Sequence, residues 1–104
     1  MIGIDLVFVP EFEQQLKAGG ETFMRKAFRV SEPLSDKAEH LAGMWAAKEA
    51  VMKAATVQPD KWTDIVISHD SEGRPHAHIN ERVFEISIAH HGDYAVAVAQ
   101  EINI

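Results

Sequence analysis

The chain has 104 residues, of which 46% are hydrophobic and 25% are charged, and it contains no cysteine. This composition predicts one globular domain spanning residues 1–104, and it excludes disulfides, thiolate metal sites and thiol nucleophiles. The formal net charge of -6 argues against nucleic acid and anionic membranes as partners. The sequence shows neither an apolar run near the ~20 residues of a membrane span nor a signal peptide, so we expect a cytoplasmic protein.

The N-terminal segment predicts a strand followed by two short helices. Residues 1–9 are apolar and β-branched around a single charge, Asp5, as in a buried strand. A proline then suits the first turn of a helix over residues 10–18, which the glycine pair at 19–20 ends. Apolar and basic side chains alternate over residues 23–28, which predicts the second short helix.

The longest periodic segment runs over residues 35–55 and predicts the one long helix. Ser35 is placed to cap it, with Glu39 near the position of a capping-box partner. Apolar and small side chains recur at steps of three or four, so one face is expected to pack on the rest of the protein.

The C-terminal part predicts two antiparallel hairpins. Their strands are expected over residues 62–68, 76–80, 83–90 and 94–102. This order of elements predicts an α+β fold in which a largely antiparallel sheet packs against one long and two short helices.

Asp5 stands out because a carboxylate in an apolar strand is costly unless it meets a cation or hydrogen-bond donors. It either lies at the strand edge and caps a neighbouring loop, or it serves a site. The sequence leaves both interpretations open.

A second candidate is the line Trp45, Glu49 and Lys53, which stand four residues apart on the long helix. Glu49 and Lys53 either form an ordinary surface ion pair, or belong to a site that holds a hard cation. In the second case Asp5 and Glu49 bind magnesium and Lys53 faces the phosphates that the metal also binds. Magnesium suits such a partial set, because it takes one or two carboxylates and leaves its other positions to water and phosphate.

The histidines form a third candidate. His90 is expected near the mouth of a turn, as a partly exposed side chain or a phosphate contact. His76 and His78 fall on one face of a strand and, with His90 and His91, define an alternative transition-metal site.

Several segments of the chain, in this order, resemble the holo-[acyl-carrier-protein] synthases, the short 4′-phosphopantetheinyl transferases. The most specific are the Gly3-Ile4-Asp5-Leu6-Val7 strand and the Trp45-Ala46-Ala47-Lys48-Glu49-Ala50 helix. The likeness continues through residues 23–28, 62–65, 73–75 and 86–97, and so runs from end to end of the chain.

The resemblance implies transfer of 4′-phosphopantetheine from coenzyme A to a serine of an acyl carrier protein or a related carrier domain. Adenosine 3′,5′-bisphosphate leaves, and Mg²⁺ is required. The resemblance also implies a homotrimer whose active sites are shared between neighbouring protomers.

Matching positions assign roles to individual residues. Asp5 and Glu49 would bind the metal, and Glu49 and Lys53 would be the catalytic side chains, with Glu49 as base and Lys53 on a phosphate. His90 would contact the phosphates of the coenzyme, and the turn that contains Arg74 and Pro75 would lie against the adenine.

Two departures from the family pattern bear on this expectation. Glu11 and Met44 stand where basic residues are common, the first on the surface that meets the acidic carrier and the second beside the phosphates of the coenzyme. Together with the segment between Asn80 and Val83, which is too short for the helix that the family usually has there, they raise the alternative of a coenzyme A-binding or interaction protein on the same fold, with weak or no transferase activity.

Overall fold

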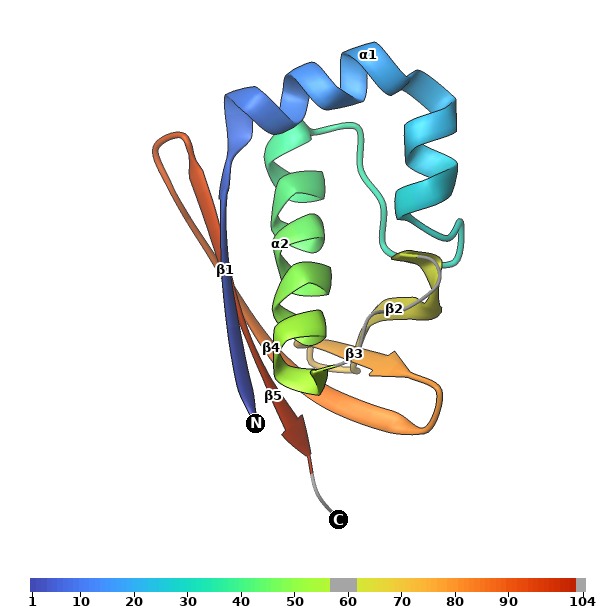
Figure 1. Cartoon of the computed structure of the whole chain (residues 1–104), viewed down its shortest axis with the longest axis vertical. Coiled ribbons are helices and arrows are strands. Elements are labelled where there is room, and N and C mark those ends of the chain that lie inside the picture. Colours follow the sequence, from blue (N-terminus) through green and yellow to red (C-terminus); the bar gives the residue numbers. More distant parts are fainter. Residues whose placement is uncertain (57–61, 103–104) are drawn as a thin grey trace.

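The computed structural model describes residues 1–56 and 62–102, in which a five-stranded sheet carries a long helix on one face (Figure 1). The chain begins with strand β1 (Ile2–Phe8), helix α1 (Val9–Ala27) and helix α2 (Ala38–Ala55). A short 3-10 helix, η1 (Trp62–Asp64), then precedes the other four strands. These are β2 (Ile65–His69), β3 (Pro75–Ile79), β4 (Arg82–His91) and β5 (Tyr94–Ile102).

The strand order is β1-β5-β4-β3-β2, and every neighbouring pair is antiparallel. The predicted α+β fold with its antiparallel sheet is therefore confirmed. The N-terminal strand enters at the sheet edge beside β5, where Asp5 lies opposite Ala97. None of the helices in the described part of the chain is long and apolar enough to cross a membrane.

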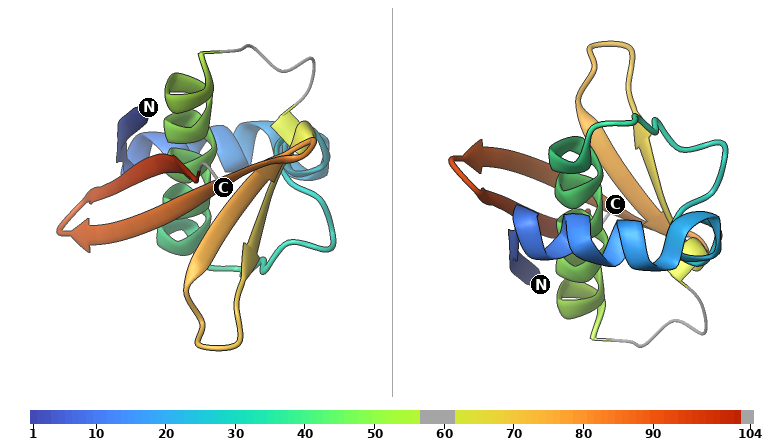
Figure 2. Two further views of the ribbon diagram at one scale, coloured as in Figure 1. Left: turned by 90° about the horizontal axis from the view of Figure 1, so that it is seen from below. Right: turned by 90° about the horizontal axis from the view of Figure 1, so that it is seen from above.

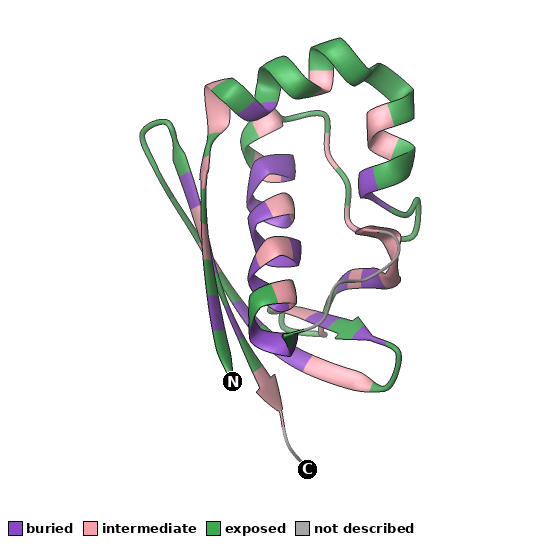
Figure 3. Cartoon of the chain, in the orientation of Figure 1, coloured by how far each residue is buried: buried purple, intermediate pink, exposed green. Residues whose placement is uncertain are grey.

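Helix α2 lies against β1 and β5, and small side chains make this close contact possible. Six alanines of the helix and three of β5 are buried, and Figure 3 shows burial concentrated along α2. Gly3 belongs to the same contact, because a Cβ atom there would overlap the carbonyl oxygen of Ala50. These buried alanines are Ala42, Ala46, Ala47, Ala50, Ala54, Ala55, Ala95, Ala97 and Ala99.

Helix α1 contains the break that the glycine pair predicts. Gly20 has φ 53° and ψ -140°, which is non-helical backbone available to glycine, and the helical turns on its two sides point in different directions (Figure 1). The two short helices expected over residues 10–18 and 23–28 are thus the two arms of α1. The first arm lies across the N-terminal end of α2, as Figure 2 shows from above.

Two predicted boundaries are wrong. Helix α2 begins at Ala38 after Lys37, and Ser35 instead accepts a hydrogen bond from the Lys37 N–H at 3.1 Å. That local turn uses the Ser35 hydroxyl before the helix starts. The strand expected from residue 62 begins only at Ile65, because Trp62–Asp64 form the 3-10 turn that brings Trp62 against Trp45.

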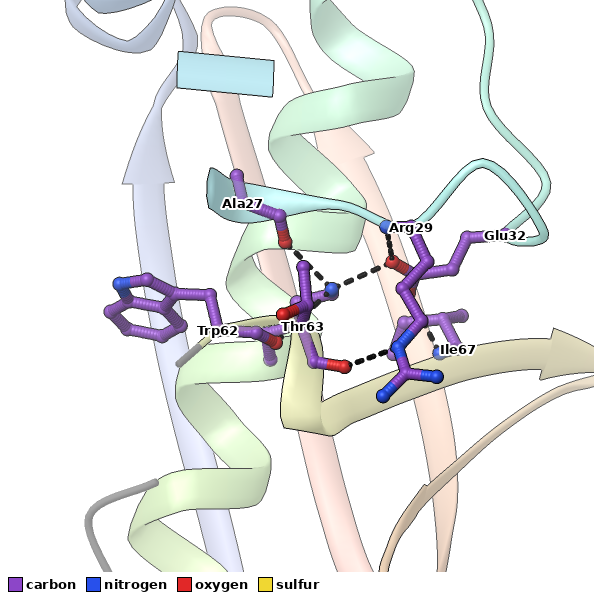
Figure 4. A network of polar contacts seen from close by, with 7 residues as sticks. Ala27, Arg29, Glu32, Trp62, Thr63 and Ile67 are labelled. Atoms are coloured by element: carbon purple, nitrogen blue, oxygen red, sulfur yellow. Dashed lines mark hydrogen bonds and ion pairs between the residues drawn. The ribbon is translucent and has the colours of Figure 1, made fainter. Parts of the chain in front are cut away.

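A buried ion pair joins α2 to the segment that follows α1. The side chains of Lys48 and Glu32 are both fully buried, and Lys48 Nζ lies 2.7 Å from Glu32 Oε1. Lys48 also donates to the carbonyl oxygens of Ala27, at 2.7 Å, and Trp62, at 3.3 Å (Figure 4). The pair therefore ties together α1, α2 and η1.

Glu32 completes this network from the other side. Its carboxylate accepts the backbone N–H of Arg29 at 2.7 Å and that of Ile67, in β2, at 2.8 Å. Each carboxylate oxygen thus has a donor, which is the condition for a stable buried charge. Burial lowers the pKa of Lys48, and the hydrogen bond to Glu32 opposes that shift.

The face of the sheet opposite α2 is apolar and exposed where β1 and β5 pair. Leu6 is 62% exposed, and its neighbours on both strands point to the same side. Monomeric proteins rarely leave such a continuous apolar surface open to water. The exposed side chains on this outer sheet face include Ile2, Ile4, Leu6, Phe8, Tyr94 and Val98.

Candidate active site

Asp5 meets the cation that its buried position requires. Strand alternation turns it toward α2, where its side chain is only 16% exposed, and Lys53 Nζ donates to Asp5 Oδ1 at 3.0 Å. Lys53 also donates to the carbonyl oxygen of Ile4 at 2.9 Å. The loop-capping interpretation of Asp5 is therefore wrong.

Glu49 lies on the same side of α2 as Lys53, one turn earlier. Partial burial raises the pKa of the Glu49 carboxyl, the nearby charge of Asp5 raises it further, and Lys53 lowers it. Lys53 forms its ion pair with Asp5 rather than with Glu49 among the described residues, so the surface pair considered from sequence is not formed. The structure thus brings together Asp5, Glu49 and Lys53.

This arrangement suits a hard divalent cation. Two carboxylates from different elements, β1 and α2, face one another closely enough for the charge of one to raise the pKa of the other. Among described residues no cluster of three or more His, Asp or Glu side chains is able to hold a metal ion, so Asp5 and Glu49 make a partial site. Magnesium is commonly held by such a pair, with water and substrate phosphate in its remaining positions.

An aromatic groove lies next to Glu49, on the side toward the start of α2. Trp45 stands one turn before Glu49. The centroid of its ring lies 4.4 Å from the ring centroid of Trp62 and 5.5 Å from that of Phe23. The groove between them has a volume of about 330 Å³, and Lys26 lies at its wall. Sequence reasoning missed this groove because Trp62 was assigned to a strand.

A second groove gathers the other predicted binding residues. It has a volume of about 460 Å³ and is lined by Arg74, Pro75 and His90, as well as by two histidines that the sequence did not single out, His40 and His69. The hairpin between β2 and β3 supplies one wall, and α2 and the end of β4 supply the others. We call this the histidine groove.

His90 is held against the first half of α2. Its Nε2 lies 2.8 Å from the Glu39 carbonyl oxygen, and a Cβ on Gly43 would come within 3.0 Å of the ring. Glu49 lies six to ten residues further along the helix, or roughly 9–15 Å at 1.5 Å per residue. Within one chain, His90, Arg74 and Pro75 therefore share a groove that lies apart from the carboxylates.

Arg74 is positioned by its own turn. The Asp70 carboxylate accepts the N–H groups of Glu72 and Arg74, both at 2.9 Å, while Gly73 takes the positive φ of 82° that closes the turn. These backbone donors, Arg74 first, hold the pKa of Asp70 below its usual range. The Arg74 guanidinium also pairs with Glu72 at 2.6 Å and remains largely exposed.

The alternative metal site built from histidines is wrong. His76 lies opposite Glu85 on β4, whereas His90 and His91 lie at the far end of that strand. Along β4, Glu85 and His90 are five residues apart, which corresponds to a distance of roughly 17 Å. His76 and His78 are therefore too far from the other pair to share an ion.

An α+β protein with two facing carboxylates and a lysine beside them has the groups that metal-assisted phosphoryl transfer uses. Comparison with known proteins gives the same class, because residues 1–99 match the 4′-phosphopantetheinyl transferase superfamily. Holo-[acyl-carrier-protein] synthases of Mycobacterium tuberculosis and Mycobacterium bovis are 37% identical over 120 aligned residues, which cover 94% of this chain and 92% of each relative.

Solved structures agree with the sequence comparison. A Helicobacter pylori holo-[acyl-carrier-protein] synthase in complex with coenzyme A superposes with a TM-score of 0.89 at 29% identity, covering 98% of this chain and all of that one. A Bacillus anthracis holo-(acyl-carrier-protein) synthase in complex with CoA (3′,5′-ADP) gives 0.79 at 30% identity, with 98% and 96% covered. The chain belongs to the 4′-phosphopantetheinyl transferase superfamily, and the resemblance drawn from its sequence is confirmed.

Proposed function

We propose that this protein is a holo-[acyl-carrier-protein] synthase, which transfers 4′-phosphopantetheine from coenzyme A to a serine of an acyl carrier protein. The observation that carries the proposal is that Asp5, Glu49 and Lys53 lie together on the fold of this family, although Asp5 and Lys53 are 48 residues apart in the sequence. The cytoplasmic location expected from the sequence stays a prediction.

The reaction needs the groups that this site holds. The serine oxygen forms a bond to the phosphorus that bears the pantetheine arm, the bridging P–O bond of the pyrophosphate breaks, and adenosine 3′,5′-bisphosphate leaves with the bonding electrons. Bound Mg²⁺ would neutralise charge on the phosphate oxygens. Asp5 and Glu49 would hold that ion, and Lys53 would turn from Asp5 toward a phosphate oxygen.

Glu49 is also suited to take the proton that the serine loses. Its raised pKa brings the carboxylate closer to neutral pH, where a general base is most effective. The aromatic groove that begins at Trp45 lies one helical turn from Glu49 and would receive the carrier, with Lys26 facing its acidic surface. Repulsion of that surface by Glu11, exposed on α1, stays a prediction.

The distance between the carboxylates Asp5 and Glu49 and the histidine groove supports an active site shared between protomers. In one chain the carboxylates and the histidine groove lie apart, so a single coenzyme would reach both most simply when the groove of one protomer approaches the carboxylates of another. The outer sheet face supplies the apolar surface that such an assembly would bury. We therefore propose that copies of this chain assemble through this face, as the homotrimer that the family resemblance implies.

Light scattering tests the trimer. We expect a mass about three times the 11.6 kDa of one chain, and a fall to the monomer mass for Leu6→Lys, because a buried lysine would lose its hydration. Transferase activity is expected to fall with the mass, since the site is shared. Val30→Lys is the matched control, because Val30 is 98% exposed and lies outside the sheet. A monomeric wild-type protein would contradict the proposal.

Intact-mass spectrometry of an apo acyl carrier protein tests the transferase reaction directly. After incubation with the protein, coenzyme A and Mg²⁺, we expect the carrier to gain the mass of one phosphopantetheine, and EDTA is expected to abolish the gain. A carrier whose acceptor serine is replaced by alanine is the control. Coenzyme A binding without any gain, across several carriers, would instead indicate a binding protein on the same fold.

A further inference from the structure

The short helix η1 is held by two cationic side chains from other segments of the chain. A 3-10 helix of three residues leaves most of its carbonyl oxygens without partners inside the helix, so its place depends on donors from outside. Arg29 Nε donates to the carbonyl oxygen of Thr63 at 2.6 Å, and Lys48 Nζ donates to that of Trp62 at 3.3 Å (Figure 4). The loop after α1 and the middle of α2 therefore both anchor η1.

The Arg29 guanidinium acts on η1 and not on the buried ion pair beside it. Glu32 accepts a hydrogen bond from the backbone N–H of Arg29, which any residue at this position would supply. Burial is the main cause of the lowered pKa of Lys48, and the nearby charge of Arg29 adds to it, so this charge opposes the buried pair. The Arg29 side chain is also exposed, and its contact with Thr63 is the shorter of the two anchors of η1.

The position of η1 decides where the ring of Trp62 lies. Thr63 follows Trp62 directly, so the hydrogen bond to its carbonyl oxygen fixes the backbone next to that ring. The ring of Trp45 packs on Phe12 and Phe23 as well as on Trp62. Among the described residues, in contrast, Trp45 is the one aromatic ring in contact with Trp62. Trp62 therefore depends on its own backbone to stay in the wall of the aromatic groove.

We propose that Arg29 is a positioning residue of the transferase reaction, which holds η1 so that Trp62 stays against Trp45 and the groove keeps the shape that receives the carrier. This inference rests on the proposed function. Arg29 acts on the groove and not on Asp5 or Glu49, so its loss is expected to weaken carrier binding and to leave the chemical step unchanged. Coenzyme A binding is expected to stay the same, because other segments build the histidine groove.

Steady-state kinetics of transfer to an apo acyl carrier protein test this role. For Arg29→Met we expect the KM for the carrier to rise about tenfold, as for loss of a charged hydrogen bond. Both kcat and the KM for coenzyme A are expected to stay within about twofold of the wild type, a separation that a general loss of structure would not produce. Arg29→Lys keeps a cationic donor and is expected to restore most of the carrier KM.

Arg25→Met is the matched control for the lost charge. Arg25 is an exposed arginine of α1 that pairs with Glu21 and does not line the groove. High salt screens exposed charges, so under that condition we expect Arg25→Met to change the carrier KM by less than about twofold, while Arg29→Met keeps its effect. Equal effects of the two variants in high salt would overturn the positioning role.

Tryptophan fluorescence tests the placement of Trp62 without a carrier. Trp45 and Trp62 are the only tryptophans of the sequence, so the emission reports on this pair of rings. For Arg29→Met we expect the emission to shift to longer wavelength as Trp62 gains water, and Arg29→Lys is expected to keep the wild-type spectrum. An unchanged spectrum or an unchanged carrier KM in Arg29→Met would overturn the role of Arg29. Absence of transfer by the wild type to any carrier would refute the proposed function itself, whatever the spectra show.

Discussion

Replacement of Glu49 by glutamine is expected to lower the rate of phosphopantetheine transfer at least about 100-fold, because the variant loses both a metal ligand and the proposed base. Glutamine keeps the size of the side chain, so the helix and its contacts with β1 are retained. The measurement is kcat/KM from intact-mass spectrometry of the carrier at saturating Mg²⁺. Asp5→Asn is expected to act in the same direction through the same ion.

Glu39→Gln is the matched control for this prediction. Glu39 is an exposed glutamate of the same helix, and only its backbone carbonyl oxygen takes part in the histidine groove. Its replacement should leave transfer within about twofold of the wild type. Undiminished transfer by Glu49→Gln, with the control also active, would contradict the assignment of Glu49.

The stability of the same variant gives an independent result with a defined sign. Because the folded-state pKa of Glu49 is raised, the folded protein binds more protons than the unfolded chain between the ordinary glutamate pKa and the raised value. The charged carboxylate therefore destabilises the metal-free protein above that window, and the penalty disappears below about pH 4.3. We expect Glu49→Gln to melt above the wild type at pH 8 in EDTA, and the difference to close near pH 4.

A variant that melts below the wild type at pH 8 would show that Glu49 stabilises the fold instead. In that case lost activity would have to be separated from lost structure before the residue was called catalytic. The two measurements together therefore distinguish a site residue from a structural one.

Replacement of Lys48 by methionine is expected to destabilise the protein by about 3–5 kcal/mol, the cost of leaving a buried charge without its partner. Glu32 would keep its two backbone N–H donors but lose the only side-chain cation among its described partners. Methionine is close to lysine in length, so cavity formation contributes little. Urea unfolding at one fixed protein concentration measures the change, since assembly would shift the midpoint.

Lys17→Met is the matched control for this second prediction. Lys17 pairs with Glu13 at 3.9 Å on the exposed surface of α1, and such pairs contribute roughly 0–1 kcal/mol. The double variant Lys48→Met with Glu32→Gln removes both charges and is expected to recover part of the loss. Strictly additive losses in the double variant would show that the two side chains do not act as a pair.

The periodic parts of the fold were predictable because they depend on local patterns. Alternation along 94–102 and the recurrence of small and apolar residues over 35–55 each indicate one buried face, and both elements are found. The break at Gly20 was equally local, since glycine alone adopts its backbone conformation without strain. The helix start at Ala38 was missed because a serine turn competed with the expected cap.

The candidate site was predictable only in part. The sequence identified Asp5, Glu49 and Lys53 as candidate site residues. A charge within an apolar strand and a line of polar side chains along a helix are both unusual features that can be recognised from neighbouring residues alone. No local pattern of residues indicates that His40 shares a groove with His90. Three segments must pack together before that relation exists, so no spacing along the chain records it.

By itself, the sequence determined the kinds of element, their order and the family to which the chain belongs, since these follow from local periodicity and from residue motifs in a set order. Only the tertiary structure decided which charges meet: Lys53 with Asp5 rather than Glu49, and Lys48 with Glu32 in the interior. The physical reason is that strand register and helix packing set these distances. Both depend on the burial of the whole core, which no single segment specifies.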